Sequence, residues 1–276
     1  MAAEPSVYLG MSQTTLDRQY EQRTLVPDVG SYFSRWRDAS AATARSYGQP
    51  IRLAYGPRPW QYADVFLPEH KGPEGLHIHY HGGAWKALDS ESAWWLAESW
   101  LAEGWQFASV NFGLVPDISL NEQVTEARQC LAKLPSWLQG EGFGLPGRIL
   151  VSGHSSGAHL AAMAALTGRA RQAAVDTVIL ASGCYDLAPV QRSARNDYLS
   201  LTEEVAFALS PVHHLLPSPP ATLLVWSRNE LTEFRRQAEL LARAMEYRGA
   251  PASTFALDVP THFDTWELIT PDLLRG

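Results

Sequence analysis

Ser155 lies at the centre of a Gly-x-Ser-x-Gly segment whose surroundings suit a nucleophilic serine. A β-branched apolar run at 148–151 precedes the segment and an alanine-rich run at 158–166 follows it, which predicts a strand, a sharp turn and a helix. Gly153 and Gly157 have no side chains, so the two backbones can approach closely at the turn. We interpret Ser155 as a nucleophile at the tip of this turn; the alternative is a plain connection between strand and helix.

A serine hydroxyl needs a base to remove its proton and a third group to orient that base. With a nucleophile on such a turn, the acid follows it along the chain and the histidine comes last. His262 follows the last predicted strand, in a loop before the last predicted helix, and is the expected base. Glu230 follows the strand predicted at 221–226 and is the expected acid, with Glu233 as the alternative.

The other histidines and acids near these positions fit structural roles better. His159 comes one helical turn after the serine, where it points away from the turn. His213 and His214 lie among prolines and leucines, which favours packing or a place in the pocket wall. Asp258 and Asp264 flank the histidine loop and are interpreted as turn and helix-cap residues.

The intermediate formed by serine attack carries a negative oxygen, which backbone N–H groups must stabilise. We expect these groups from Ser156, directly after the nucleophile, and from Gly82 and Gly83, which follow the strand predicted at 76–80. A zinc site at the alternating histidines His77, His79 and His81 is the rival interpretation, but successive side chains on one face of a strand lie about 7 Å apart and span one metal poorly. We therefore expect neither a metal nor a cofactor.

About eight short strands alternate with helical runs along most of the chain, which predicts one α/β domain with a mostly parallel sheet and helices on both faces. Residues 1–50 are predicted as a helical arm, either packed on the domain or forming part of a roof over the active site. Residues 183–219 interrupt the alternation and are predicted as a small insertion above the sheet. The chemistry is expected at the carboxyl ends of the strands.

The composition excludes several classes of partner. Among 276 residues, 46% are apolar and the net charge is −7, so a large core is available but no basic face for nucleic acid or an anionic membrane. Residues 1–6 lack the basic and apolar regions of a secretory signal, and no apolar run reaches transmembrane length. Cys130 and Cys184 are interpreted as reduced packing residues. A cytoplasmic protein with a small-molecule substrate is expected, and a homodimer is left open.

Several motifs together resemble the arylformamidase (kynurenine formamidase) group of α/β hydrolases, which lies near the hormone-sensitive-lipase-like esterases. The resemblance rests on the segments at 81–85, 153–160, 182–187, 201–204, 210–211, 233–237 and 262–264, with further matches at 16–20 and 55–56. It covers nearly the whole chain. Glu230 stands where animal members carry an aspartate, and Ser156 stands where an alanine is frequent.

The resemblance implies an α/β-hydrolase fold and the hydrolysis of N-formylkynurenine, or of a related aryl formamide or ester. Trp85 and Tyr185 are the aromatic residues expected to flank an aryl substrate. A broad-range carboxylesterase using the same three side chains is the alternative activity, because esterases share these motifs. A binding protein that keeps the scaffold without catalysis is the alternative from another class.

Overall fold

The computed structural model describes residues 4–69, 74–144, 147–168 and 174–275. Residues 1–3, which belong to the segment predicted to lack a secretory signal, lie outside the described residues. In these ranges the strands are β1 (Ser6–Tyr8), β2 (Met11–Ser12), β3 (Ile51–Ala54), β4 (Tyr62–Phe66), β5 (Leu76–Tyr80), β6 (Gln106–Val110), β7 (Ile149–His154), β8 (Thr177–Ala181), β9 (Ala221–Ser227) and β10 (Ala252–Leu257).

The α-helices are α1 (Gln13–Arg18), α2 (Val29–Tyr47), α3 (Ala97–Ala102), α4 (Leu120–Gly140), α5 (Ser156–Ala165), α6 (Ala188–Arg192), α7 (Asn196–Leu199), α8 (Glu203–Ala208) and α9 (Thr232–Tyr247). Short 3₁₀ helices are η1 (Gln22–Leu25), η2 (Ser90–Leu96), η3 (Pro211–His213), η4 (Asp264–Leu268) and η5 (Pro271–Leu274). No helix in the described ranges is long and apolar enough to cross a membrane.

Eight strands form one sheet in the order β10-β9-β8-β7-β5-β6-β4-β3. The pairs from β10 to β6 are parallel, whereas β4 pairs antiparallel with β6 and β3 antiparallel with β4. The central strands β5, β6 and β7 are buried along their whole length, as strands covered on both faces must be. The predicted α/β-hydrolase fold, with its mostly parallel eight-stranded sheet, is confirmed.

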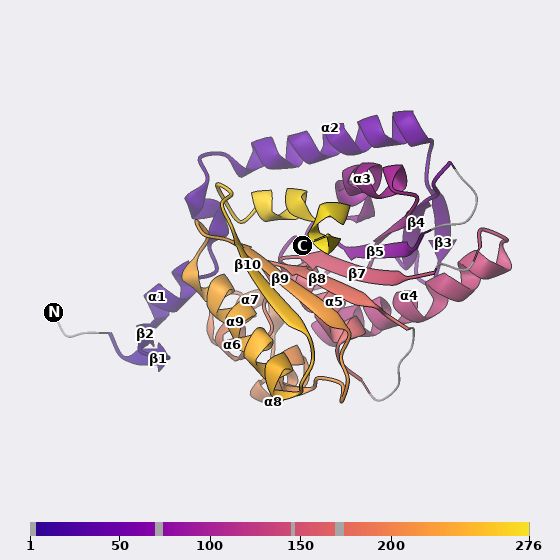
Figure 1. Ribbon diagram of the computed structural model, residues 1–276. Coiled ribbons are helices and arrows are strands. Elements are labelled where there is room, and N and C mark those ends of the chain that lie inside the picture. The colour runs from indigo at the N-terminus through magenta and orange to yellow at the C-terminus, as the bar shows by residue number, and fades with distance from the viewer. Residues whose placement is uncertain (1–3, 70–73, 145–146, 169–173, 276) are drawn as a thin grey trace.

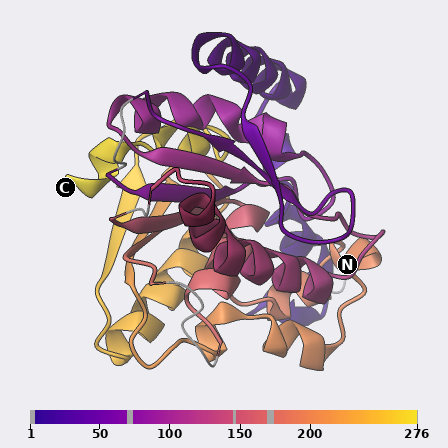
Figure 2. The same cartoon turned by 90° about the vertical axis from the view of Figure 1, so that its right-hand side faces the viewer.

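Helices cover both faces of the sheet (Figure 1). On one side α4, α5 and α9 enclose a core that includes Leu131, Leu160 and Leu241. On the other, η2, α3 and η4 pack around Trp100, Phe107 and Trp266, and α2 lies outside them as the outermost element (Figure 2). Burial of these aliphatic and aromatic side chains is the main stabilising term of the domain.

The structure differs from the predicted elements mainly at short segments. A two-stranded β1–β2 hairpin precedes α1 and was not predicted. The apolar pattern at 90–103 and at 265–269 predicts a helix in each segment. The first is the 3₁₀ helix η2 followed by the short α-helix α3, and the second lies in the 3₁₀ helix η4. Asp28 caps α2 by accepting from the Gly30 amide.

The N-terminal arm and the insertion at 183–219 are joined to each other. Gln13 in α1 donates to the carbonyl of Arg192 at 2.8 Å, and the Ala194 amide donates to Asp17 at 2.7 Å. Arg195 donates to the carbonyl of Tyr20 at 2.7 Å. These two segments, distant in the sequence, therefore form one continuous cover beside the carboxyl ends of the strands.

Candidate active site

Ser155 occupies the turn between β7 and α5 in a conformation that few side chains adopt. Its φ is 55° and its ψ is −121°, and its amide donates to the carbonyl of Ala181 in the neighbouring strand β8. A Cβ atom at Gly157 would lie 2.1 Å from the carbonyl oxygen of Tyr80, and one at Gly153 would lie 2.2 Å from that of Gly157. The two glycines of the motif are therefore required by close backbone contacts, as the sequence pattern predicts.

His262 and Glu230 form a buried pair. Nδ1 of His262 lies 2.7 Å from Oε2 of Glu230, and both side chains are almost inaccessible to water. Ser182 donates to the other carboxylate oxygen at 3.0 Å, and Gln22 from the N-terminal arm approaches Oε2 at 3.5 Å. The bond at Nδ1 leaves Nε2 of His262 as the nitrogen able to accept a proton.

Burial lowers the pKa of His262, and the positive charge of Arg195 lowers this pKa further. The imidazole is therefore neutral at rest, with its Nδ1 proton directed at Glu230. Burial raises the pKa of Glu230, and the hydrogen bond from Ser182 acts in the opposite direction by favouring the charged form. A neutral imidazole is the state that a general base requires.

The loop that carries His262 is attached to the turn that carries the serine. Nε2 of His154, the residue before Ser155, lies 2.9 Å from the carbonyl oxygen of His262, and Thr265 donates to the same oxygen at 2.7 Å. The His154 ring is stacked on Trp266 with an interplanar angle of 5°. Sequence reasoning missed these supporting residues; the position of His154 inside the motif was the only signal for any of them.

The expected oxyanion-stabilising groups lie around the same turn. Gly82 is packed against it, since a Cβ atom there would lie 3.1 Å from Nδ1 of His154 and 3.4 Å from Cβ of Ser155. Gly83 has a φ of +106° and lines the same pocket as Ser155. Ser156 is the first residue of α5, whose first N–H groups have no acceptor within the helix. In the described ranges, no protein acceptor takes the amide of Gly82, Gly83 or Ser156.

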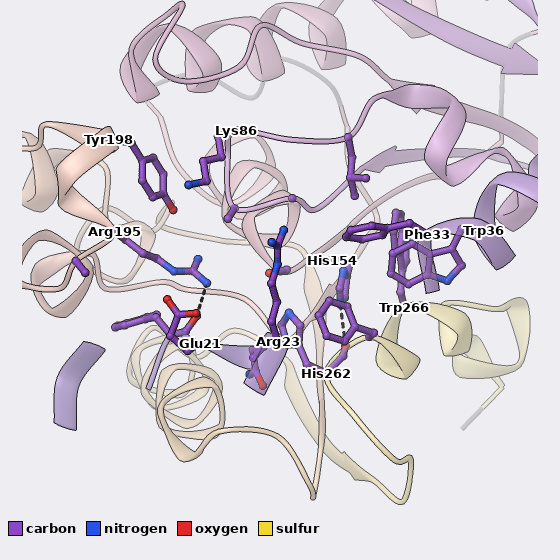
Figure 3. Close-up of a pocket in the computed structure, with 18 of the residues that line it drawn as sticks. Glu21, Arg23, Phe33, Trp36, Lys86, His154, Arg195, Tyr198, His262 and Trp266 are labelled. Atoms are coloured by element: carbon purple, nitrogen blue, oxygen red, sulfur yellow. Dashed lines mark hydrogen bonds between the residues drawn. The ribbon is translucent and has the colours of Figure 1, made fainter. Parts of the chain in front are cut away.

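A pocket of about 430 Å³ opens beside Ser155 and His262, within the size range of small-molecule sites. Aromatic side chains form much of its wall, and several are seen in Figure 3 around His154 and His262. The aromatic lining consists of Tyr20, Phe33, Trp36, Tyr198, Phe263 and Trp266. These residues come from the N-terminal arm, the insertion and the last loop, so the arm forms part of the roof.

Trp85 and Tyr185 do not line this pocket, which differs from their predicted role beside the substrate. Both are fully buried. Trp85 has a φ of 63° and its ring nitrogen donates to His159 at 3.2 Å, which directs the indole into the interior. Tyr185 lies in the core cluster around α5 and α9. The aromatic wall is supplied instead by residues whose position depends on tertiary packing.

Glu233, the alternative acid, is placed elsewhere. Its carboxylate pairs with Arg236 at 2.7 Å and accepts from Tyr20 at 3.1 Å and from Gln237 at 3.0 Å. These contacts tie α9 to the N-terminal arm, and none of them reaches His262. The structure therefore brings Glu230, not Glu233, to the histidine.

Three other histidines have structural partners. His77 and His79 both contact Ser152 Oγ, at 2.6 and 2.7 Å, and His79 accepts from Trp266 at 2.9 Å. His159 lies 2.8 Å from the carbonyl oxygen of Leu209. Over the part of the chain that the structure describes, no group of three or more His, Cys, Asp and Glu side chains is arranged to hold a metal ion.

The fold and the pocket define a hydrolase. Residues 63–244 match the BD-FAE family model, which is more than half of the chain, and the protein belongs to that family. The similarity to kynurenine formamidases inferred from the motifs is confirmed: the kynurenine formamidase of Danio rerio is 28% identical over 97% of this chain and 94% of its own length. That of Salmo salar is 28% identical over 93% of this chain and 91% of its own length.

Solved structures show the same fold. A candidate thioesterase from Silicibacter sp. superimposes with a TM-score of 0.79 at 26% identity, covering 91% of this chain and 93% of its own. An esterase of Pyrobaculum calidifontis has a TM-score of 0.65 at 22% identity, with 94% and 93% covered, and this likeness supports the fold alone. The protein is a hydrolase that acts on a small molecule.

Proposed function

We propose that the protein is a serine hydrolase that cleaves an aryl formamide such as N-formylkynurenine to an aromatic amine and formate. The observation that carries the proposal is the His262–Glu230 pair, 2.7 Å apart, beside Ser155 in a pocket with aromatic walls. The similarity to two kynurenine formamidases over nearly the whole chain supports the formamide as substrate.

In the proposed mechanism, Ser155 Oγ attacks the formyl carbon while Nε2 of His262 takes the hydroxyl proton. Glu230 holds the imidazole in the required tautomer and stabilises the imidazolium that forms. The N–H groups of Gly82, Gly83 and Ser156 stabilise the negative oxygen of the tetrahedral intermediate. His262 then gives the proton to the leaving nitrogen, the amine departs, and Ser155 is left as a formyl ester.

A water molecule completes the cycle. It gives a proton to His262 and attacks the formyl ester, and the second tetrahedral intermediate releases formate as His262 returns the proton to Ser155 Oγ. In the described residues, no hydrogen bond joins Ser155 to His262. Hydrogen bonds between a catalytic serine and its base are frequently long or poorly aligned until substrate binds. Neither step requires a cofactor.

Replacement Ser155→Ala tests the nucleophile. We expect kcat to fall by about four to six orders of magnitude, since the residual rate would come from binding and the oxyanion-stabilising groups alone. Formate release from N-formylkynurenine is the measurement, and Ser99→Ala, on α3 outside the pocket, is the matched control. A purified Ser155→Ala protein that keeps more than a tenth of the wild-type turnover would refute the mechanism.

A broad-range carboxylesterase is the second candidate, favoured by the esterases among the structural neighbours. Comparison of kcat/KM for N-formylkynurenine and for short p-nitrophenyl esters separates the two activities: a much higher value on the formamide supports the first. Labelling by a fluorophosphonate separates both from a non-catalytic binding protein, which would not be modified. A homodimer and a cytoplasmic location remain predictions, to be tested by light scattering and by fractionation.

A further inference from the structure

The pocket beside Ser155 contains cations that have no carboxylate partner. Arg23, Lys86 and Arg195 line it, together with the acidic residues Glu21 and Asp197. Among the described residues, no carboxylate lies within 4.0 Å of any of these three cations. Figure 3 shows all three pointing into the same space. A cation kept in a partly apolar pocket without a counter-ion is suited to bind an anionic ligand group.

Arg195 is the best held of the three. It is half-buried, whereas Arg23 and Lys86 are exposed. One of its nitrogens donates to the Tyr20 carbonyl at 2.7 Å, which fixes the guanidinium while leaving its other nitrogens free of partners in the described residues. The guanidinium carbon Cζ of Arg195 lies 5.3 Å from the centre of the Tyr20 ring and 5.9 Å from the centre of the Trp85 ring. Lys86, by contrast, rests on the Tyr198 ring at 3.9 Å.

Arg195 is also close to the catalytic centre of the proposed mechanism. It lines the same pocket as Ser155 and His262, and its charge contributes to lowering the pKa of His262. A ligand group bound to Arg195 would therefore belong to the same molecule whose acyl carbon is presented to Ser155. The planar guanidinium can hold both oxygens of a carboxylate at once.

We propose that Arg195 binds a carboxylate carried by the substrate, so that the protein prefers aryl formamides with an amino-acid side chain to those without a carboxylate. This inference rests on the proposed function and narrows its substrate class. Arg195 would act as a specificity-determining residue that contributes to binding and takes no part in bond breaking.

The alternative is a purely structural role, in which Arg195 only joins the insertion to the N-terminal arm through Tyr20. A structural role predicts that loss of Arg195 affects all substrates alike. A carboxylate-binding role predicts a loss confined to substrates that bear the carboxylate. Two substrates that differ only in that group therefore separate the two roles.

The experiment compares N-formylkynurenine with N-formylkynuramine, which lacks the carboxylate, in wild type, Arg195→Met and Arg195→Lys. We expect Arg195→Met to lower kcat/KM for N-formylkynurenine by about 10- to 100-fold, mainly through KM, because a charge-assisted hydrogen bond is lost. The value for N-formylkynuramine should change less than about threefold, and Arg195→Lys should restore part of the loss.

Arg192→Met is the matched control, because Arg192 lies in the same insertion, pairs with Glu203 at 3.2 Å and does not line the pocket. It should leave the ratio between the two substrates unchanged. Equal losses on both substrates in Arg195→Met, or no loss on either, would overturn the inference.

Failure of the proposed function would look different. If the wild type cleaves neither formamide, the same proteins are compared on 4-acetoxybenzoate and its uncharged methyl ester. These two esters again differ in one carboxylate, but the reaction is ester hydrolysis. Calorimetric measurement of the affinities for kynurenine and kynuramine tests the same carboxylate preference without turnover. In the kinetic and in the calorimetric experiment, a preference for the carboxylate-bearing ligand that disappears in Arg195→Met supports the inference. A wild type without this preference contradicts the inference.

Discussion

Six imidazoles are held neutral in the interior, which predicts a stability that falls steeply in acid. Burial lowers the pKa of His81 and of His159 to about 4, and that of His262 to about 3. It lowers the pKa of His77, His79 and His154 well below the usual value near 6.5. In the unfolded chain each ring titrates near its usual pKa, so below about pH 6.5 the unfolded state binds more protons and the free energy of unfolding decreases.

The size of the effect follows from the number of groups. Each depressed imidazole costs about 1.4 kcal/mol for each pH unit below its unfolded pKa, until its folded pKa is reached. At pH 5.5 the six together lower the free energy of unfolding by about 8 kcal/mol relative to pH 8, which is a large part of the ~5–15 kcal/mol typical of a domain. Glu230 opposes them, since burial raises its pKa and protonation on acidification favours the folded state.

Urea unfolding followed by tryptophan fluorescence at pH 8 and 5.5 measures the difference, and the ten tryptophans provide the signal. The Glu230→Gln background removes the opposing carboxyl, so the full loss of about 8 kcal/mol should appear there. His159→Gln in that background should reduce the loss by about one sixth. His213→Gln, at an exposed ring, is the control. A loss below about 2 kcal/mol in Glu230→Gln would refute the reasoning.

Two further predictions concern residues that support the site. Ser182→Ala removes the hydroxyl that donates to one oxygen of Glu230 at 3.0 Å. It should lower kcat by about tenfold with little change in KM. Steady-state kinetics that show an unchanged kcat would contradict this prediction. Gln237→Leu removes the acceptor of the Tyr185 and Asp186 amides, at 2.8 and 2.7 Å, and should cost about 2–6 kcal/mol because two buried N–H groups lose their partner. Urea midpoints test it, and a loss under about 1 kcal/mol would show that the loop finds other acceptors.

The sharp turn at Ser155 and the pairing of His262 with Glu230 could be predicted because each depends on a local rule. The close approaches at Gly153 and Gly157 leave a sequence pattern, and the order of nucleophile, acid and histidine follows from the order of parallel strands. Glu230 was favoured over Glu233 because it lies in the loop after a strand, whereas Glu233 lies at the start of the next helix, and the structure places both residues there. The eight-stranded sheet could likewise be predicted, because its strands appear in the sequence as short apolar runs that alternate with helical runs.

The supporting contacts and the pocket wall could not be predicted, because they join segments far apart in the chain. The hydrogen bond from Ser182 to Glu230 joins the loops after two different strands. The hydrogen bond from Arg195 to the Tyr20 carbonyl forms only when the arm folds onto the insertion. Trp85 was expected beside the substrate because it is aromatic, but a positive φ and a hydrogen bond to His159 direct its ring inward. A side chain's direction at an irregular turn is not encoded in residue type.

The bond from the His154 ring to the main chain of His262 has a mechanical consequence. The residue next to the nucleophile holds the residue that supplies the base, at 2.9 Å, and Thr265 holds the same carbonyl from the other side. We therefore expect a displacement of the tip of β7 to carry the main chain of His262 with it, so that Ser155 and His262 move together. The spacing between these two residues should then change little when the arm and the insertion that cover them fluctuate.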